Sequence, residues 1–418
     1  MQLKPVSLLG LFVFIGLAWV LSNNRKLFPW RTVLCGLALQ FGFALFILKT
    51  PWGAHIFRFL QSVFNKLGDF ANEGARMVFG PLADPAVMTE KFGADHAFLF
   101  VISITASIVV VSSLSSLFYH YGILQRVVHF MAVIMQRTMR TSGSESLAAA
   151  VNMFVGQTES ALVIKLYLAG MTASEILALM TIGMATIASG VMVAYAQMGL
   201  DPGHLLTASV MSAPGALLIA KIMLPETQPS ETASTSKIKT EVHTLNGIEA
   251  LCRGASEGMT LAINVMAMLI AFVAAVALAN FTIGWMQRQC GVHDPITLQT
   301  ILGWVNTPFA WLMGAPWKDC HVFGQLLGER VLLNEFFAYA HLSGLLRHDP
   351  VAMTRRGVIL ATYALCGFAN FGSIAIQIGG ISAIAPTRRA DLARFGLRSM
   401  IGGLLSCYLS AAIAGMLL

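Results

Sequence analysis

The sequence predicts an all-helical protein that crosses a membrane many times. Of its 418 residues, 56% are hydrophobic and only 11% are charged, and the mean hydropathy is +0.71. A soluble protein of ordinary composition carries about 25% charged residues. The apolar residues also recur in runs long enough to cross a bilayer, and some runs are interrupted by glycine and polar residues. These observations predict a polytopic membrane protein with broken helices.

Segments that are long and apolar enough to span a bilayer, or nearly so, recur along the whole chain. They are 6–22, 32–47, 97–119, 176–198, 205–223, 259–283, 357–384 and 400–418. The first of them follows Lys4 and could be a signal peptide. However, it ends without a small-x-small cleavage site, and Arg25 and Lys26 follow at once. We therefore expect eight transmembrane helices.

The stretches between these segments differ in character. Residues 51–80 place phenylalanine and leucine at helical spacing with charged residues between them, which predicts an amphipathic helix in the membrane interface. Residues 125–140 show a similar pattern. Residues 224–247 are rich in proline, serine and threonine and predict a flexible polar linker.

Charge and motif content exclude other classes of protein. The net charge of +7 comes from basic clusters between spans, which is typical of the positive-inside rule rather than of nucleic-acid binding. No HExxH, Walker A, GxGxxG or GxSxG motif is present, so the sequence does not predict an enzyme. The six cysteines are scattered without a CxxC pair and predict neither disulfides nor a metal site.

A polar cluster stands out against this apolar background. Glu159 lies in Gly156-Gln157-Thr158-Glu159-Ser160, with apolar residues on both sides, and Asn334-Glu335 lies in a similar setting. Polar and ionisable groups in hydrocarbon are costly and usually mark a solute or ion pathway, although helix–helix hydrogen bonding is the alternative. The first polar segment is short for a full crossing and suits a re-entrant helical hairpin.

The two parts of the chain also share a fragment. Gly183-Met184-Ala185-Thr186-Ile187-Ala188-Ser189 resembles Gly367-Phe368-Ala369-Asn370-Phe371-Gly372-Ser373, and each interrupts an apolar run. A chance match between helices rich in alanine and glycine is the alternative. Paired, glycine-interrupted segments in two halves are typical of inverted-repeat transporters, in which unwound backbone binds ions and solutes.

The polar residues indicate the chemistry of the solute. Glutamine and threonine suit the edge of a heterocycle, and a carboxylate with asparagine and serine suits vicinal hydroxyls. Phe368 could pack on a flat ring or a sugar face. Lys165 is the only basic residue near the first cluster in the sequence, so a neutral polar molecule is favoured over a phosphate or carboxylate.

Three motifs resemble the signatures of one family. Gly156-Gln157-Thr158-Glu159, Asn334-Glu335-Phe336-Phe337-Ala338-Tyr339 and Gly367-Phe368-Ala369-Asn370-Phe371 resemble those of the concentrative nucleoside transporters, in the family's order. The short N-terminal part resembles the bacterial members. The resemblance implies a homotrimer of eight-span protomers, each with a scaffold domain and a transport domain that carries two re-entrant hairpins in an inverted repeat.

The resemblance also implies a division of the chain. Residues 1–120 would form the N-terminal scaffold helices with the interfacial helix, and 121–224 the first repeat of the transport domain. Residues 225–256 would be the polar linker, 257–285 a scaffold helix, and 286–418 the second repeat. The implied hairpins lie at about 142–170 and 320–346, and the broken helices at about 176–198 and 357–384.

Site residues follow from the same resemblance. Those implied for the nucleoside are Gln157, Thr158, Glu159, Val191, Glu335, Phe368, Asn370 and Ser373. Those implied for sodium are Asn152, Val155, Thr186 and Ile187. The chain departs from many members at Ser160-Ala161, where Ala-Pro is common, and at Thr186, where serine is common.

The resemblance therefore implies a sodium-coupled symporter that imports uridine-like nucleosides across the bacterial inner membrane by an elevator movement. It implies no cofactor other than sodium as coupling ion, and no nucleic-acid partner. A proton-coupled permease for nucleosides or another neutral polar solute is the alternative, and a membrane enzyme acting on a nucleoside-like lipid is a further rival. The sequence leaves open the purine or pyrimidine preference, the coupling stoichiometry and the favoured access state.

Overall fold

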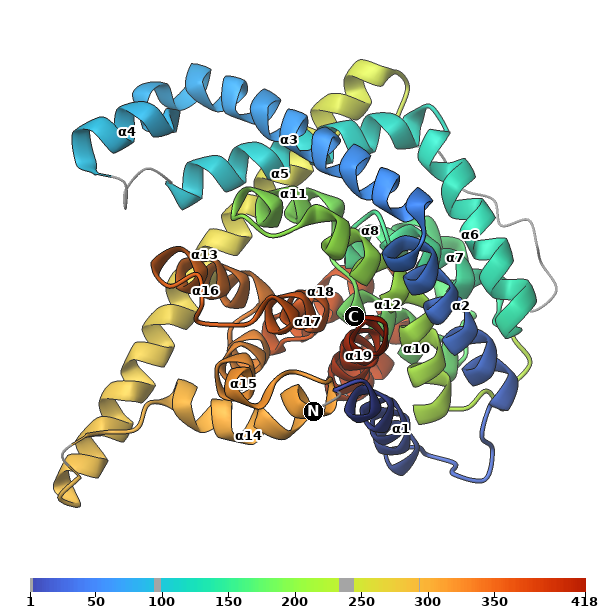
Figure 1. The fold of residues 1–418 in the computed structure, drawn as a ribbon. Coiled ribbons are helices and arrows are strands. Elements are labelled where there is room, and N and C mark those ends of the chain that lie inside the picture. The colour runs from blue at the N-terminus through green and yellow to red at the C-terminus, as the bar shows by residue number, and fades with distance from the viewer. Residues whose placement is uncertain (1–2, 94–98, 233–243, 293) are drawn as a thin grey trace.

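The computed structural model describes residues 3–93, 99–232, 244–292 and 294–418, and these are helical without any β-strand. The helices of the first part are α1 Lys4–Val20, α2 Trp30–Lys49, α3 Pro51–Phe79, η1 Gly80–Ala83, α4 Pro85–Phe92, α5 Phe100–His120, α6 Ile123–Met139, α7 Gly143–Asn152, α8 Gln157–Val163, α9 Lys165–Leu168, α10 Ala173–Ala185, α11 Ser189–Gln197 and α12 Pro202–Met223. The expected amphipathic helices at 51–80 and 125–140 correspond to α3 and to α6 (Figure 1).

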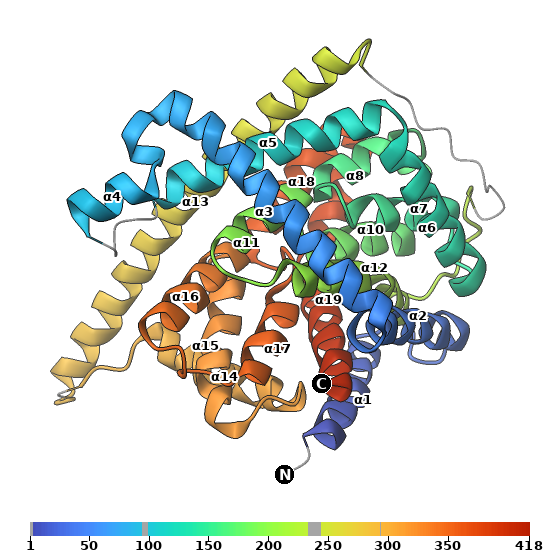
Figure 2. The ribbon, with the colours of Figure 1, turned by 45° about the horizontal axis from the view of Figure 1, so that its top comes forward.

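The second part begins after the linker. Its helices are α13 Gly247–Gln289, α14 Leu298–Leu312, α15 Trp317–Leu332, α16 Glu335–His348, α17 Arg355–Leu365, α18 Phe371–Ile384, η3 Pro386–Arg388 and α19 Arg389–Leu417. The terminal helices α1 and α19 pack side by side, so both ends of the described chain lie in one region of the molecule (Figure 2).

Six of the described helical stretches are long and apolar enough to cross a membrane. They are Trp30–Lys49, Val101–His120, Ala173–Gln197, Pro202–Met223, Gly247–Gln289 and Pro386–Leu417. Lys4–Val20 and Phe371–Ile384 are shorter apolar helices, and they coincide with the expected spans at 6–22 and in the second half of 357–384. The multi-span helical class predicted from the sequence is therefore correct.

The linker expected at 225–256 is shorter than predicted at its C-terminal end. Helix α13 already begins at Gly247, because the side chain of Asn246 accepts the amide of Glu249 and caps the helix. One turn further on, Arg253 and Glu257 form a 2.9 Å ion pair at the i,i+4 spacing that supports a helix. The hydropathy pattern did not predict this first part of α13, because its residues are largely polar.

Two further boundaries differ from expectation. Helix α14 was not predicted, because its 15 residues include Pro308 and are too few for a span. It nevertheless packs extensively on α15. Helix α19 begins at Arg389 instead of 400, since its first three turns carry arginines that a hydropathy pattern assigns to a loop.

Both expected broken helices are interrupted. Helix α10 ends at Ala185 and α11 begins at Ser189, and helix α17 ends at Leu365 and α18 begins at Phe371. The two breaks touch, because a Cβ atom on Gly367 would lie 2.8 Å from the carbonyl oxygen of Ala185. Gly367 has φ +156°, so glycine serves both the backbone conformation and the close approach.

Helix pairs occupy both segments where re-entrant hairpins were expected. In the first, α7 begins at a capping box between Ser142 and Glu145 and is joined to α8 through residues 153–156. In the second, α15 and α16 meet at Leu333-Asn334, and the Asn334 side chain caps α16 by accepting the Phe337 amide at 2.8 Å. Helix α8 packs beside α18, so the first hairpin and the second broken helix adjoin (Figure 2).

Helix α13, 43 residues long, runs diagonally across one side of the molecule and packs along α5 (Figure 1). Glycines permit this contact, because a Cβ on Gly254 would lie 2.5 Å from the Ser112 carbonyl oxygen and one on Gly258 would lie 2.9 Å from Val109 Cα. Much of the remaining surface of α13 is exposed and apolar, including Ile263 and Ile270. Such a surface suits lipid or another protein chain.

Candidate functional site

A cavity of about 290 Å³ opens where the helix interruptions meet. Its wall combines polar residues from both hairpins, from the ends of α11 and α18 at the two breaks, and from α5 and α13. Among them are Ser112, Ser115, Gly156, Gln157, Thr158, Glu159, Ser189, Glu257, Asn334, Glu335, Phe368, Asn370 and Ser373. Residues that lie more than 250 positions apart in the sequence thus surround one space.

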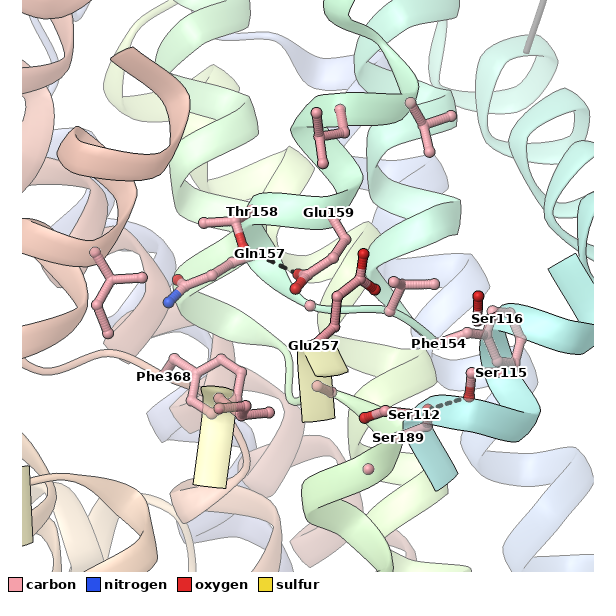
Figure 3. Close-up of a pocket in the computed structure, with 18 of the residues that line it drawn as sticks. Ser112, Ser115, Ser116, Phe154, Gln157, Thr158, Glu159, Ser189, Glu257 and Phe368 are labelled. Carbon is pink, nitrogen blue, oxygen red and sulfur yellow. Dashed lines mark hydrogen bonds between the residues drawn. The ribbon is translucent and has the colours of Figure 1, made fainter. Parts of the chain in front are cut away.

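The first hairpin contributes Gln157, Thr158 and Glu159 at the start of α8 (Figure 3). The hydroxyl of Thr158 donates to Glu159 Oε2 at 3.0 Å, and the side chain of Glu159 folds back over the helix start. A Cβ atom on Gly156 would collide with this carboxylate. The glycine therefore lets the three polar side chains occupy the tip together.

The second hairpin contributes Glu335 as the first residue of α16. Glu335 is 4% exposed, and its carboxylate accepts from Tyr195 Oη at 2.9 Å and from Asn370 Nδ2 at 3.2 Å. Among the residues that the structure describes, no basic side chain lies within ion-pair distance of it, although the positive charge of Arg330 in the same hairpin acts on it from further away. A buried carboxylate held by neutral donors is costly, and such groups concentrate at functional sites.

The second broken helix supplies one of the two donors to Glu335. Asn370 caps α18 through Oδ1, which accepts the Ser373 amide at 2.8 Å, and this leaves Nδ2 for the carboxylate. Phe368 and Ser373 line the same cavity. Of the residues implied for the nucleoside, only Val191 lies outside the cavity wall; it is buried in α11 next to Gly190, which does line the wall.

The residues implied for sodium lie behind this tip, where two helices end. Asn152 is the last residue of α7, and Thr186 follows the last residue of α10. With its amide nitrogen toward the acceptors, Asn152 donates to the carbonyls of Val155 at 3.1 Å and Gly156 at 3.2 Å. Its oxygen then accepts from Gly183 N at 3.0 Å and Thr186 Oγ1 at 3.2 Å. Asn152 thus joins the first hairpin to the first break.

This second cluster has the chemistry of a hard-cation site. Amide, hydroxyl and backbone carbonyl oxygens are the ligands that such cations prefer, and two helix C-termini add the negative ends of their dipoles. Val155 reaches the cavity wall, whereas Ile187 is buried in the break. No cluster of three or more His, Cys, Asp or Glu residues that could hold a metal occurs within the described residues.

The structure adds residues to the site that the sequence did not indicate. Tyr195, one of the donors to Glu335, reads in the sequence as an ordinary aromatic residue of an apolar helix. Glu257 of α13 lies near Glu159 in the wall of the same cavity (Figure 3). Ser115 of α5 and Ser189 of α11 place their hydroxyl oxygens 3.3 Å apart. Only Ser189 belongs to a fragment noted in the sequence, and its partner, like those of Tyr195 and Glu159, comes from a distant element.

Comparison with known proteins covers nearly the whole chain. Residues 204–415 match the family described as "Na+ dependent nucleoside transporter C-terminus", 9–82 match its N-terminal counterpart, and 101–201 match "Nucleoside recognition". The chain is 37% identical to "Nucleoside permease NupC" of Helicobacter pylori, over 98% of this chain and 97% of that protein. The chain belongs to the concentrative nucleoside transporter family.

Other members of the concentrative nucleoside transporter family agree in sequence and in structure. An uncharacterized transporter of Haemophilus influenzae is 41% identical over 98% of this chain and 97% of its own. The structure of CNTnw in an inward-facing substrate-bound state superposes with a TM-score of 0.92 at 38% identity, covering 99% of this chain and 97% of that one. The protein is thus a multi-pass transporter and not an enzyme.

Proposed function

We propose that this transporter imports nucleosides such as uridine together with sodium. The observation that supports the proposal best is the single cavity in which both hairpin tips and both helix breaks meet. Its wall offers amides, hydroxyls, the buried carboxylate of Glu335 and the aromatic ring of Phe368, which suit a molecule with a heterocyclic and a polyhydroxyl part. The wall also carries charged side chains of both signs, Glu159, Lys165, Arg253 and Glu257, so it has no net excess of positive charge that would favour an anion.

Two ends of the cavity would bind the two parts of the nucleoside. Gln157 and Thr158 would contact the base, with Glu159 supporting the tip through the Thr158 hydroxyl. Glu335, Asn370 and Ser373 would hold the ribose hydroxyls, because a carboxylate accepts from two vicinal donors at once. Phe368 would pack on a flat face and Val191 would support the wall behind the base.

Sodium would act through Asn152, Val155, Thr186 and Ile187. A cation bound between the ends of α7 and α10 would fix the first hairpin against the first break, and so pre-organise Gln157 and Thr158. Sodium should therefore raise the affinity for the nucleoside, and by linkage the nucleoside must raise the affinity for sodium by the same factor.

The domain division and the elevator movement belong to the same proposal. Residues 1–120 and 257–285 would form the scaffold, and 121–224 and 286–418 the transport domain that slides along it in the bacterial inner membrane. The contact between α5 and α11, with Ser115 facing Ser189, lies on the proposed boundary. The exposed apolar surface of α13 supports an assembly such as the homotrimer implied by the family resemblance.

Uridine binding to the purified protein tests the proposal. Calorimetric titration with uridine in sodium buffer should give a dissociation constant at least about tenfold lower than in choline buffer at the same ionic strength, as expected for coupled sites. Equal affinity in both buffers, combined with a clear dependence on pH, would favour the proton-coupled alternative. Glu159 and Glu335 are the carboxylates that would carry the proton in that case.

A further inference from the structure

A glutamine outside all the motifs contacts a side chain of the first hairpin tip. Gln377 lies in the middle of α18 and is 1% exposed. Its Nε2 lies 3.0 Å from Gln157 Oε1 and 3.0 Å from the backbone carbonyl oxygen of Met180. It therefore joins the second broken helix, the first broken helix and the first hairpin at one point.

The backbone carbonyl fixes which way each amide points. A carbonyl oxygen can only accept, so the Gln377 atom beside Met180 O must be the amide nitrogen. The same nitrogen faces the end of Gln157, so the Gln157 atom there must be its oxygen. Gln157 lines the cavity, and its own amide nitrogen has no protein partner among the described residues. That nitrogen is thus a free donor to a solute.

Glycine makes this arrangement possible. A Cβ atom on Gly183 of α10 would collide with Gln377 Nε2 and would lie 3.0 Å from Gln157 Cβ. Any other residue at position 183 would therefore displace the two glutamine side chains. Gln377 Oε1 remains buried without a hydrogen-bond partner, which shows that the side chain is held by its nitrogen alone.

Thr158 presents a hydrogen-bond acceptor to the cavity, whereas Gln157 presents a donor. Its hydroxyl proton is engaged by Glu159 Oε2 at 3.0 Å, so the lone pairs of Thr158 Oγ1 are what it offers the cavity. The hairpin tip therefore presents a donor from Gln157 beside an acceptor from Thr158. The complementary base edge carries a carbonyl oxygen beside a ring N–H.

We infer that Gln377 orients Gln157 so that the transporter prefers nucleosides whose base presents a carbonyl beside a ring N–H, as uracil does, over those that present an amine beside a bare ring nitrogen, as cytosine does. This inference rests on the proposed function and narrows its substrate class. Gln377 is a positioning residue that contacts Gln157 and not the solute.

Two substitutions at Gln377 separate an effect on the orientation of the Gln157 amide from an effect on folding of the protein. Gln377→Met keeps the length but removes the donor, so the Gln157 amide can turn either way. We expect the preference for uridine over cytidine, measured as the ratio of apparent KM values, to fall about threefold to tenfold, the range of one neutral hydrogen bond. Gln377→Glu offers Gln157 an acceptor, so the Gln157 oxygen should turn to the cavity and the ratio should fall further.

One control alters another side chain of α18, and a second removes the Gln157 side chain that Gln377 contacts. Ser382→Ala alters a side chain of α18 whose hydroxyl bonds only within that helix, to Gly379 O at 3.3 Å, and should leave the ratio unchanged. In a Gln157→Ala background, Gln377→Met should no longer change the ratio, because its effect passes through Gln157. A methyl group at N3 of uridine should weaken uptake by the unaltered protein.

The outcomes distinguish a failure of the Gln377 inference from a failure of the proposed nucleoside transport. An unchanged ratio of uridine to cytidine in both Gln377 variants, with uptake of uridine intact, overturns the inference and leaves the proposed function standing. A wild-type preference for cytidine over uridine also overturns it. If the Gln377 variants lower the maximal rate for both nucleosides alike and leave the ratio unchanged, the role of Gln377 is purely structural and the inference is also overturned. Failure of the unaltered protein to transport any nucleoside would overturn the proposed function and the inference together.

Discussion

At the scale of single residues, the cavity depends on a few buried polar side chains whose bonds are nearly all accounted for. Glu335 accepts from one hydroxyl and one amide, and Asn370 uses its other end to cap α18. Each group is thus held in place before any solute arrives. Such pre-organisation lowers the cost of ordering that binding would otherwise carry.

Replacing Glu335 with glutamine tests the carboxylate directly. A neutral amide accepts more weakly and turns a donor toward Tyr195 or Asn370, so we expect the affinity for uridine to fall about tenfold to a hundredfold, the range of hydrogen bonds to a charged group. Tyr195→Phe removes one donor and should cause a smaller loss. Near-normal uptake and affinity of Glu335→Gln in proteoliposomes would rule out the ribose assignment.

Asn152 carries the link between the proposed sodium site and the hairpin tip. Asn152→Ala removes the amide that joins Val155 and Gly156 to Gly183 and Thr186. We expect the sodium concentration for half-maximal uridine uptake to rise about tenfold, since two or more hydrogen bonds are lost. Ser382→Ala serves as the control. An unchanged sodium dependence would place the coupling ion elsewhere.

At the scale of elements, the contact between the two helix breaks is the critical packing feature. Gly367→Ala would force a methyl group against the backbone of Ala185 and Met184, 2.8 Å away, at a backbone φ of +156°. Overpacking of this kind costs about 1–3 kcal/mol. We expect a lower unfolding midpoint in detergent and a loss of uptake.

The matched control lies in the same stretch. No atom lies within 4 Å of a Cβ placed on Gly379, in the middle of α18. Gly379→Ala should therefore be tolerated and should stabilise the helix slightly, because alanine is a better helix former than glycine. A Gly367→Ala protein as stable as Gly379→Ala would contradict the proposed role of the break contact.

The sequence predicted some elements and not others, for physical reasons. The helix breaks and hairpin tips were visible because glycine and polar residues are expensive in an apolar run and therefore conspicuous. The start of α13 and the whole of α14 were missed, because a polar or short amphipathic helix lacks the hydropathy of a span. Tyr195 and Gln377 were missed because their partners lie 140 and 220 positions away.

At the scale of the whole molecule, the proposed elevator requires α11 to slide along α5. Ser115 and Ser189 face each other at 3.3 Å on this boundary. With both replaced by cysteine, mild oxidation should link the two helices and stop uridine uptake, and a reductant should restore it. Each single-cysteine variant should be insensitive to the oxidant. Full uptake by the cross-linked protein would contradict sliding at this boundary.

Coupling of nucleoside import to sodium can be measured in reconstituted protein. Uptake of radiolabelled uridine into proteoliposomes is measured with an inward sodium gradient and with an inward proton gradient, each imposed alone. We predict concentrative uptake with the sodium gradient and only equilibration with the proton gradient. Concentration of uridine by the proton gradient alone would contradict the account and assign the coupling to protons.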